Sequence, residues 1–256
     1  MKIVRAGVDS LYFAVNGMLP GHVIEELARA KTNATEGRRE IPIELGETKI
    51  PALVYPHGQQ GGYEFLFDTG PLGSRFACKA SSEKRVDWNL FVKPHATAFL
   101  TRGFGPVVRS STDTLAALGG EVLDISLNRI DYAIDIRADD FTLDLARFIA
   151  HPRAKRRPYW GSTDEYHPSA VLAGRNLQSV TVGRPTGWQV IVYDKTAEAR
   201  AGSKLHWFEA WRIDPGDKVA RIWRVELRIC RDEIRQCNDC EASLILNSGS
   251  APPFAR

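Results

Sequence analysis

The stretch that decides the fold reads Arg129-Ile130-Asp131-Tyr132-Ala133-Ile134-Asp135. It lies in an isoleucine-rich segment, residues 127–136, whose composition predicts a β-strand. Because side chains alternate across a strand, the arginine and both aspartates share one face, and the isoleucines and Tyr132 share the other. One face is therefore core and the other carries charge. On a straight strand the two carboxylates lie about 13 Å apart, at a rise of about 3.3 Å per residue, so we expect at most one of them to contact a given ion.

Two later segments repeat this charged pattern. Tyr193-Asp194-Lys195 follows the apolar strand 190–192 and leads to Glu198. The segment Arg224-Val225-Glu226-Leu227-Arg228 again alternates charged with apolar residues, and the glutamate lies between the two arginines. Together the three segments predict a site with carboxylates at Asp131, Glu226, Asp135 and Glu198, cations at Arg129, Lys195, Arg224 and Arg228, and a phenol at Tyr193.

These residue types suit phosphodiester chemistry. Carboxylates are the ligands of hard cations such as Mg²⁺ or Mn²⁺, and the planar guanidinium of arginine matches phosphate oxygens. A tyrosine hydroxyl beside both can attack a phosphodiester and form a covalent phosphotyrosine. Its ordinary pKa of about 10 leaves little phenolate at neutral pH, so a divalent ion and Lys195 would have to assist. The alternative is that the charged residues form cross-strand ion pairs without chemistry.

A basic segment follows, with cations at Arg153, Lys155, Arg156 and Arg157. Such a run is either a solvated loop or a nucleic-acid contact. The neighbouring Tyr159 and Trp160 favour contact with DNA, because bases stack on aromatic rings beside cations. We expect Arg228 to contribute a further DNA contact.

The rest of the chain predicts an α+β fold, a mainly antiparallel central sheet with helices packed on it. We expect strands at 8–17, 49–55, 63–67, 76–80 and 88–92 in the first half, and at 127–136, 180–182, 188–193 and 222–229 in the second. Apolar spacing predicts a helix from Pro20 that gives way to a loop at 32–40, and further helices at 106–118, 141–150 and 231–242.

Composition places the chain among ordinary globular proteins. It has 256 residues, 43% hydrophobic and 25% charged, with a net charge of +3, which excludes collagen-like and wholly disordered classes. The chain contains no run of about 18 apolar residues, so the sequence predicts no membrane-spanning helix. The N-terminus lacks the apolar core of a signal peptide. Only four cysteines are present, which fits a reducing compartment. We therefore expect a cytoplasmic protein without a membrane partner.

Four motifs in chain order resemble the replication initiation factor family of rolling-circle plasmids and filamentous phages (the Rep_trans type). The family patterns are V-D-x-L-x-x-x-V, R-x-D-x-A-x-D, V-Y-x-K-x-x-E after a glycine-turn hairpin, and W-R-V-E-L. They are matched by Val8–Val15, Arg129–Asp135, Val192–Glu198 and Trp223–Leu227. The resemblance spans most of the chain, with its specificity in residues 128–228. It implies a single replication-initiator-like domain over 1–256, with an N-terminal half of about 1–120 and a motif-bearing half of about 121–245. The early end at Arg256 leads us to expect a C-terminally truncated form.

The resemblance implies a function. Members of the family nick one strand of an origin: a tyrosine attacks the phosphodiester, stays joined to the 5′ phosphate and frees a 3′ hydroxyl. Carried over residue by residue, Tyr193 becomes the nucleophile, Lys195, Arg129 and Arg224 steady the phosphate, and Asp131, Glu226, Glu198 and Asp135 hold Mg²⁺ or Mn²⁺. The implied partners are single-stranded or cruciform origin DNA, a host helicase and a second copy of the chain in a dimer.

Two other functions fit the same residues. A non-catalytic origin-binding protein would use the arginine-flanked strands and Arg153–Arg157 only to contact phosphates. A water-using, metal-dependent nuclease would release products with no protein attached. Cleavage of DNA would distinguish the initiator from the non-catalytic origin-binding protein. Covalent attachment of the protein to DNA would distinguish the initiator from the water-using nuclease.

Overall fold

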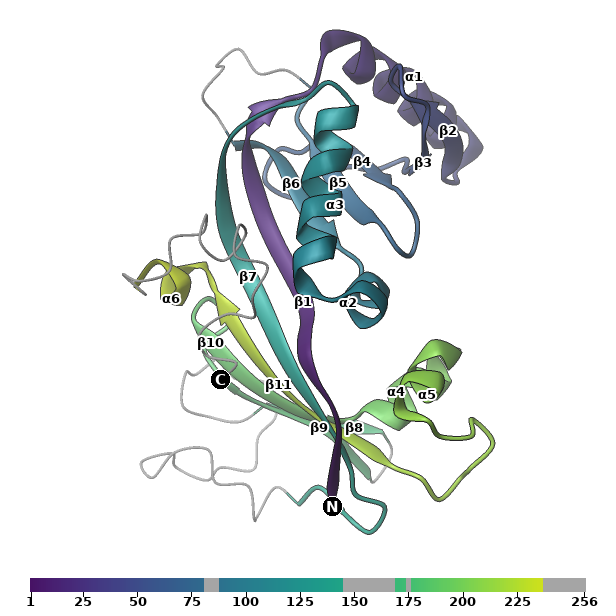
Figure 1. Ribbon diagram of the computed structural model, residues 1–256, viewed down its shortest axis with the longest axis vertical. Helices are drawn as coiled ribbons and strands as arrows, with labels where there is room; N and C mark the ends of the chain where they lie inside the picture. The colour runs from purple at the N-terminus through teal and green to yellow at the C-terminus, as the bar shows by residue number, and fades with distance from the viewer. Residues whose placement is uncertain (81–87, 145–168, 174–175, 237–256) are drawn as a thin grey trace. The chain divides into compact units, whose positions relative to one another are not determined.

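A computed structural model describes residues 1–80, 88–144, 169–173 and 176–236 (Figure 1). The described residues form two compact units, the first of residues 1–9 and 130–236 and the second of residues 10–129. The chain passes from one unit to the other inside β1 (Lys2–Met18) and again inside β7 (Glu121–Arg137). Both units combine strands with helices, which confirms the expected α+β class.

In the first unit the strand order is β1-β7-β11-β10-β9-β8. The strands not yet bounded are β8 (Ser169–Ala173), β9 (Asn176–Gly183), β10 (Trp188–Asp194) and β11 (Ile222–Cys230). Strands β9 and β10 form the expected antiparallel hairpin. A side chain at Gly183 would put a Cβ 2.1 Å from the carbonyl oxygen of Trp188, and its φ is +107°, so the turn requires glycine.

Alternation gives this sheet one apolar and one charged face, as the sequence predicts. The apolar face packs Val180, Val182 and Trp223 against Ala138 and Leu143. On the other face, the β10–β11 register sets Tyr193 opposite Arg224 and Ile191 opposite Glu226. Two short helices, α4 (Lys195–Ala201) and α5 (Leu205–Trp211), contribute side chains to this charged face, and α5 carries the buried Trp207 and Trp211. Helix α6 (Arg231–Gln236) follows β11.

In the second unit the strand order is β2-β3-β4-β5-β6-β1-β7. Its further strands are β2 (Ile41–Leu45), β3 (Ile50–Val54), β4 (Phe65–Asp68), β5 (Ser74–Cys78) and β6 (Trp88–Pro94). Its helices are α1 (Gly21–Gly37), α2 (Ala96–Arg102) and α3 (Phe104–Ala117). Figure 1 shows α3 in front of this sheet, and the buried hydroxyls of Ser74 on β5 and Ser111 on α3 lie 2.7 Å apart. The face that α3 covers carries buried side chains that include Phe13, Phe76 and Val92.

Several expected boundaries were wrong. The predicted loop at 32–40 is helical as far as Gly37, because Ala30 and Ala34 continue the buried stripe of Val23 and Leu27 at helical spacing. Residues 141–144 are not helical, and the rest of the helix expected at 141–150 lies outside the described residues. The helix expected at 231–242 is confirmed over its described part, Arg231–Gln236.

Some elements had no counterpart in the expectation: β2, β8, α2, α4 and α5. They are all short, with five to seven residues each, too few for an apolar period to emerge. Within the described ranges, no helix combines the length and the apolar character that crossing a membrane requires.

An ionic cluster surrounds Asp68 in the second unit. The carboxylate lies 2.9 Å from Nε2 of His95 and 3.3 Å from Nε of Arg75, and it accepts the backbone N–H of Gly70 at 2.9 Å. Burial alone would raise the pKa of Asp68, but the hydrogen bonds from His95 and Gly70 and the charge of Arg75 outweigh it and hold the pKa below its ordinary value. The ionised carboxylate therefore stabilises the folded state.

We predict that Asp68→Asn lowers the free energy of unfolding at pH 7 by about 1–3 kcal/mol, as for hydrogen bonds to a charged group. A lowered folded-state pKa gives stability that is full above the unfolded-state pKa of about 3.9 and is lost as the pH falls through the folded-state value. The gap between wild type and variant, measured by urea unfolding, should therefore shrink below about pH 4. Asp113→Asn, at an exposed carboxylate on α3, serves as the control. A gap that stays constant between pH 7 and pH 3 would contradict the assignment.

Candidate functional site

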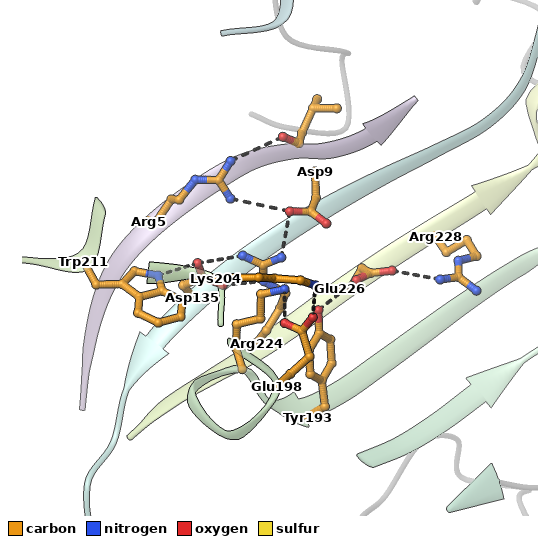
Figure 2. A network of polar contacts seen from close by, with 12 residues as sticks. Arg5, Asp9, Asp135, Tyr193, Glu198, Lys204, Trp211, Arg224, Glu226 and Arg228 are labelled. Carbon is orange, nitrogen blue, oxygen red and sulfur yellow. Dashed lines mark hydrogen bonds and ion pairs between the residues drawn. The ribbon is translucent and has the colours of Figure 1, made fainter. Parts of the chain in front are cut away.

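The centre of the charged face is the guanidinium of Arg224, which is fully buried on β11. Its Nε and Nη2 donate to the two carboxylate oxygens of Asp135 at 2.6 and 2.9 Å, and its Nη1 donates to Oδ1 of Asp9 at 2.7 Å (Figure 2). Trp211 completes the set by donating its Nε1–H to Oδ2 of Asp135 at 2.8 Å. Burial alone would lower the pKa of Arg224, but these carboxylates outweigh it and raise the pKa.

A second tryptophan, Trp207 on α5, gathers cations around its ring. The guanidinium carbon of Arg224 lies 4.4 Å from the ring centroid, Nζ of Lys195 lies 4.8 Å away and the guanidinium carbon of Arg5 5.0 Å away. Cations are attracted to the electron-rich face of an indole. The ring therefore holds three positive charges near one another and offsets part of their mutual repulsion.

The predicted nucleophile, Tyr193, donates its hydroxyl to Oε2 of Glu226 at 3.4 Å. Arg228 connects this glutamate to a second carboxylate: its Nη2 donates to Oε1 of Glu226 at 3.0 Å, and its Nε lies 3.4 Å from Oδ1 of Asp131. Burial raises the pKa of Glu226, and the negative charges of Asp131 and Asp9 raise it further. Burial also raises the pKa of Tyr193, against the opposing charge of Arg224. A phenol and two crowded carboxylates thus lie on one face of the sheet.

Glu198 on α4 lies in a separate ion pair beside this group. It contacts the ammonium groups of both Lys195 and Lys204. Burial alone would raise the pKa of Glu198, but the hydrogen bonds from the two lysines hold it below its ordinary value. Burial and the charge of Arg224 lower the pKa of Lys195. The pair therefore keeps an ammonium group 5.6 Å from the ring centroid of Tyr193.

Most of the residues predicted from the sequence meet in this unit: Asp131, Asp135, Tyr193, Lys195, Glu198, Arg224, Glu226 and Arg228. Arg129 belongs instead to the second unit, where its guanidinium lies 4.7 Å from the ring centroid of Tyr12. The basic segment with Arg153, Lys155, Arg156 and Arg157 lies outside the described residues.

The four predicted metal ligands do not converge. The oxygens of Asp135 bind Arg224 and Trp211, and Glu198 binds two lysines. In the part of the chain that the structure describes, no three His, Cys, Asp or Glu side chains are grouped to hold a metal ion. Asp131 and Glu226 are the predicted ligands that share a neighbour in Arg228. Metal binding therefore stays a prediction, and its best-placed ligands are these two.

Sequence reasoning missed several members of the site: Arg5, Asp9, Lys204, Trp207 and Trp211. A signal for Asp9 was present, because it is a carboxylate inside the apolar strand that begins with Val8. The two tryptophans lie at i and i+4, which indicates one helix face. Their spacing does not predict that the two tryptophans contact the cations and the carboxylate of this site.

Comparison with known proteins finds similarity to one phage protein and one solved structure, both at low sequence identity. No family model matches the chain. It is 23% identical over 252 residues to the uncharacterized protein ORF430 of Pseudomonas phage Pf1, an alignment that covers 93% of this chain and 56% of the relative, so the chain spans about half the relative's length. Among solved structures, a rolling circle replication initiator protein from Geobacillus stearothermophilus aligns with a TM-score of 0.42 and 12% identity, over 95% of this chain and 79% of that one.

We predict that Arg224→Met lowers the free energy of unfolding by about 3–5 kcal/mol, because it leaves two buried carboxylates without their cation. Arg224→Lys should restore only part of this loss, since an ammonium group cannot donate in the forked geometry that Asp135 accepts. Urea unfolding measures both, and Arg221→Met, at an exposed arginine preceding the same strand, is the matched control. Equal losses at positions 221 and 224 would show that the buried network does not stabilise the fold.

Proposed function

We propose that this chain nicks one strand of DNA through Tyr193 and rejoins it, and that it acts at a replication origin. One observation carries the proposal: the Tyr193 hydroxyl donates to Glu226 in a cluster where carboxylates and cations alternate. The motif resemblance around residues 128–228 supports the choice of DNA as substrate. The alternation of charges also supports the proposal, because a site that must hold both a divalent cation and a phosphate needs both signs of charge.

The covalent step balances with the residues of this site. The Tyr193 Oη forms a bond to phosphorus, and the bond from phosphorus to the 3′ oxygen breaks. The phenolic proton passes to Oε2 of Glu226, 3.4 Å away, and is passed on through solvent to the released 3′ oxygen, which becomes a hydroxyl and leaves Glu226 ionised again. One phosphodiester is exchanged for another without a change in redox state. Attack of the 3′ hydroxyl on the phosphotyrosine reverses the step and rejoins the strand.

The cationic residues suit two tasks in this step. Arg228, which contacts both Glu226 and Asp131, is placed to bind a phosphate oxygen near the phenol. Lys195 lies near the Tyr193 ring and adds positive charge beside the developing phenolate. Each of the three guanidinium nitrogens of Arg224 donates to Asp135 or Asp9, so we assign this residue to positioning and to the local electrostatic potential. In that role it opposes the rise in the Tyr193 pKa that burial causes.

The donor set fits a divalent ion at Asp131 and Glu226. These two carboxylates share Arg228 as a neighbour, and burial together with the charge of Asp131 raises the pKa of Glu226. Mg²⁺ commonly uses one or two carboxylates and completes its shell with water and substrate phosphate, so two protein ligands suffice. When bound, such an ion would polarise the scissile phosphate and favour ionisation of the phenol.

We predict that Tyr193→Phe abolishes covalent attachment to DNA. The assay incubates the full chain and Mg²⁺ or Mn²⁺ with negatively supercoiled DNA of the replicon that carries its gene, and denaturing gels then reveal protein joined to nicked DNA. Tyr132→Phe, at a tyrosine on β7 in the same unit, is the matched control and should still form the adduct. Glu226→Gln should reduce adduct formation by about 10²-fold or more, because it removes the proton acceptor.

Three results would contradict the proposal in different ways. Nicked DNA without attached protein, from both wild type and Tyr193→Phe, would favour a nuclease in which water attacks. Tight binding of the same DNA without nicking at any metal concentration would favour a non-catalytic origin-binding protein. Adduct formation by Tyr193→Phe would show that another residue is the nucleophile.

A further inference from the structure

The two arginines on the charged face of β11, Arg224 and Arg228, are held in different ways. Arg224 is fully buried and donates from each guanidinium nitrogen to a carboxylate, at 2.6, 2.7 and 2.9 Å. The side chain of Arg228 is 24% exposed, and its hydrogen bonds are longer, 3.0 Å to Glu226 and 3.4 Å to Gln189. Its Nε lies 3.4 Å from Oδ1 of Asp131. Among the described residues, that Nε has no hydrogen-bond partner.

The carboxylates that Arg228 contacts are buried and close together. The side chains of Asp131 and Glu226 are 1% and 7% exposed. They come from β7 and β11, which are neighbours in the sheet, and the two side chains also share a hydrogen bond. Carboxyl oxygens that are this close can contact the same cation. The guanidinium of Arg228 therefore binds the two residues that are the best-placed ligands for a divalent ion.

A metal ion and Arg228 cannot share these oxygens without strong repulsion. Mg²⁺ binds its oxygen ligands at about 2.0–2.1 Å, and Nη2 of Arg228 lies 3.0 Å from Oε1 of Glu226. An ion on that oxygen would lie within about 5 Å of the guanidinium nitrogen. Like charges at this separation repel, and burial strengthens the repulsion because it limits screening by water and salt.

We propose that Arg228 competes with the divalent ion for Asp131 and Glu226, and that binding of the ion displaces its guanidinium from both. The partly exposed side chain can turn toward solvent without crossing the core. Once released, it is available for a phosphate oxygen of the substrate. Metal and phosphate would then favour each other, because each draws away one partner of the same ion pair. The inference rests on the proposed function in taking the incoming ion to be Mg²⁺ or Mn²⁺.

A permanent structural ion pair explains the contacts of Arg228 less well. A structural guanidinium in this sheet is represented by Arg224, whose three nitrogens all donate to carboxylates. A buried donor without a hydrogen bond, such as Nε of Arg228, costs free energy in a permanent contact. The weaker hold on Arg228 also lowers the cost of displacing it. The difference between the two arginines thus fits one that stays and one that leaves.

Binding of Mn²⁺ to the full chain, without DNA, tests the proposal. Titration followed by the electron paramagnetic resonance signal of free Mn²⁺ gives the affinity. We expect Arg228→Gln to bind Mn²⁺ about tenfold or more tightly than wild type, because a competing positive charge is removed. Arg228→Lys should lie between the two, since one ammonium group cannot contact both carboxylates through separate nitrogens.

Two control variants locate the effect. Arg221→Gln removes an exposed cation that precedes the same strand and should leave the Mn²⁺ affinity within about twofold of wild type, because exposed charges are screened. Adding Glu226→Gln to Arg228→Gln should abolish the gain, because a carboxylate ligand is lost. A gain that survives in the double variant would place the ion elsewhere and overturn the proposal.

Thermal unfolding gives a second readout, which a merely structural arginine would not alter. Ligands stabilise the folded state according to their affinity for it. Mn²⁺ should therefore raise the unfolding temperature of Arg228→Gln by more than that of wild type, and Arg228→Lys should again be intermediate. If Arg228→Gln does not fold without metal, the comparison of Arg228→Lys with wild type carries the test.

The outcomes separate this proposal from the proposed nicking reaction. Mn²⁺ affinity that is unchanged or weaker in folded Arg228→Gln would overturn the competition, and so would the absence of Mn²⁺ binding by wild type and variants at millimolar concentration. Tighter Mn²⁺ binding by Arg228→Gln, without a covalent adduct at Tyr193 in wild type, would support the competition and contradict only the nicking reaction. Adduct formation by wild type with equal Mn²⁺ affinities would do the reverse.

Discussion

The buried guanidinium of Arg224 is the interaction on which the first unit depends. A charge removed from water costs several kcal/mol unless it is paired and fully hydrogen-bonded, and here Asp135 and Asp9 provide the pairing. These three residues come from β11, β7 and β1, which are far apart in the chain. Satisfying one arginine therefore ties three strands together. Through the β10–β11 register it also fixes where Glu226 and Tyr193 lie.

Charge is used differently in the two units. Around Tyr193 the signs are interleaved, and Arg228 lies between the carboxylates of Asp131 and Glu226. In the second unit cations lie beside aromatic rings instead, as Lys93 and Arg129 lie beside Tyr12. The first arrangement suits a site that must hold a cation and a phosphate in one step, and in the second the cations are attracted to the electron-rich face of the ring. The net charge of +3 is a sum over the whole chain and reveals neither arrangement of charge.

The sequence predicted those features that local geometry determines. Alternation in a strand has a period of two, so Asp131 and Asp135 were correctly placed on one face before any partner was known. Partner choice is not local: nothing near residue 135 shows that it binds a guanidinium 89 positions away. For the same reason Glu198 was taken as a metal ligand although two lysines bind it. Arg129 shares the strand of Asp131, but the boundary between the units falls between them.

Burial at Tyr193 has opposite effects on the two halves of the proposed reaction. It raises the pKa of the phenol, and the positive charge of Arg224 opposes that rise; a raised pKa makes attack on the phosphate harder. The same burial limits access of water to a phosphotyrosine once it forms, and excluding water prevents hydrolysis of a reactive intermediate. A nuclease that uses water would gain nothing from this protection. An enzyme that must rejoin the strand needs the intermediate to last until the 3′ hydroxyl returns. A half-buried tyrosine between Arg224 and Glu226 therefore fits rejoining better than simple cleavage.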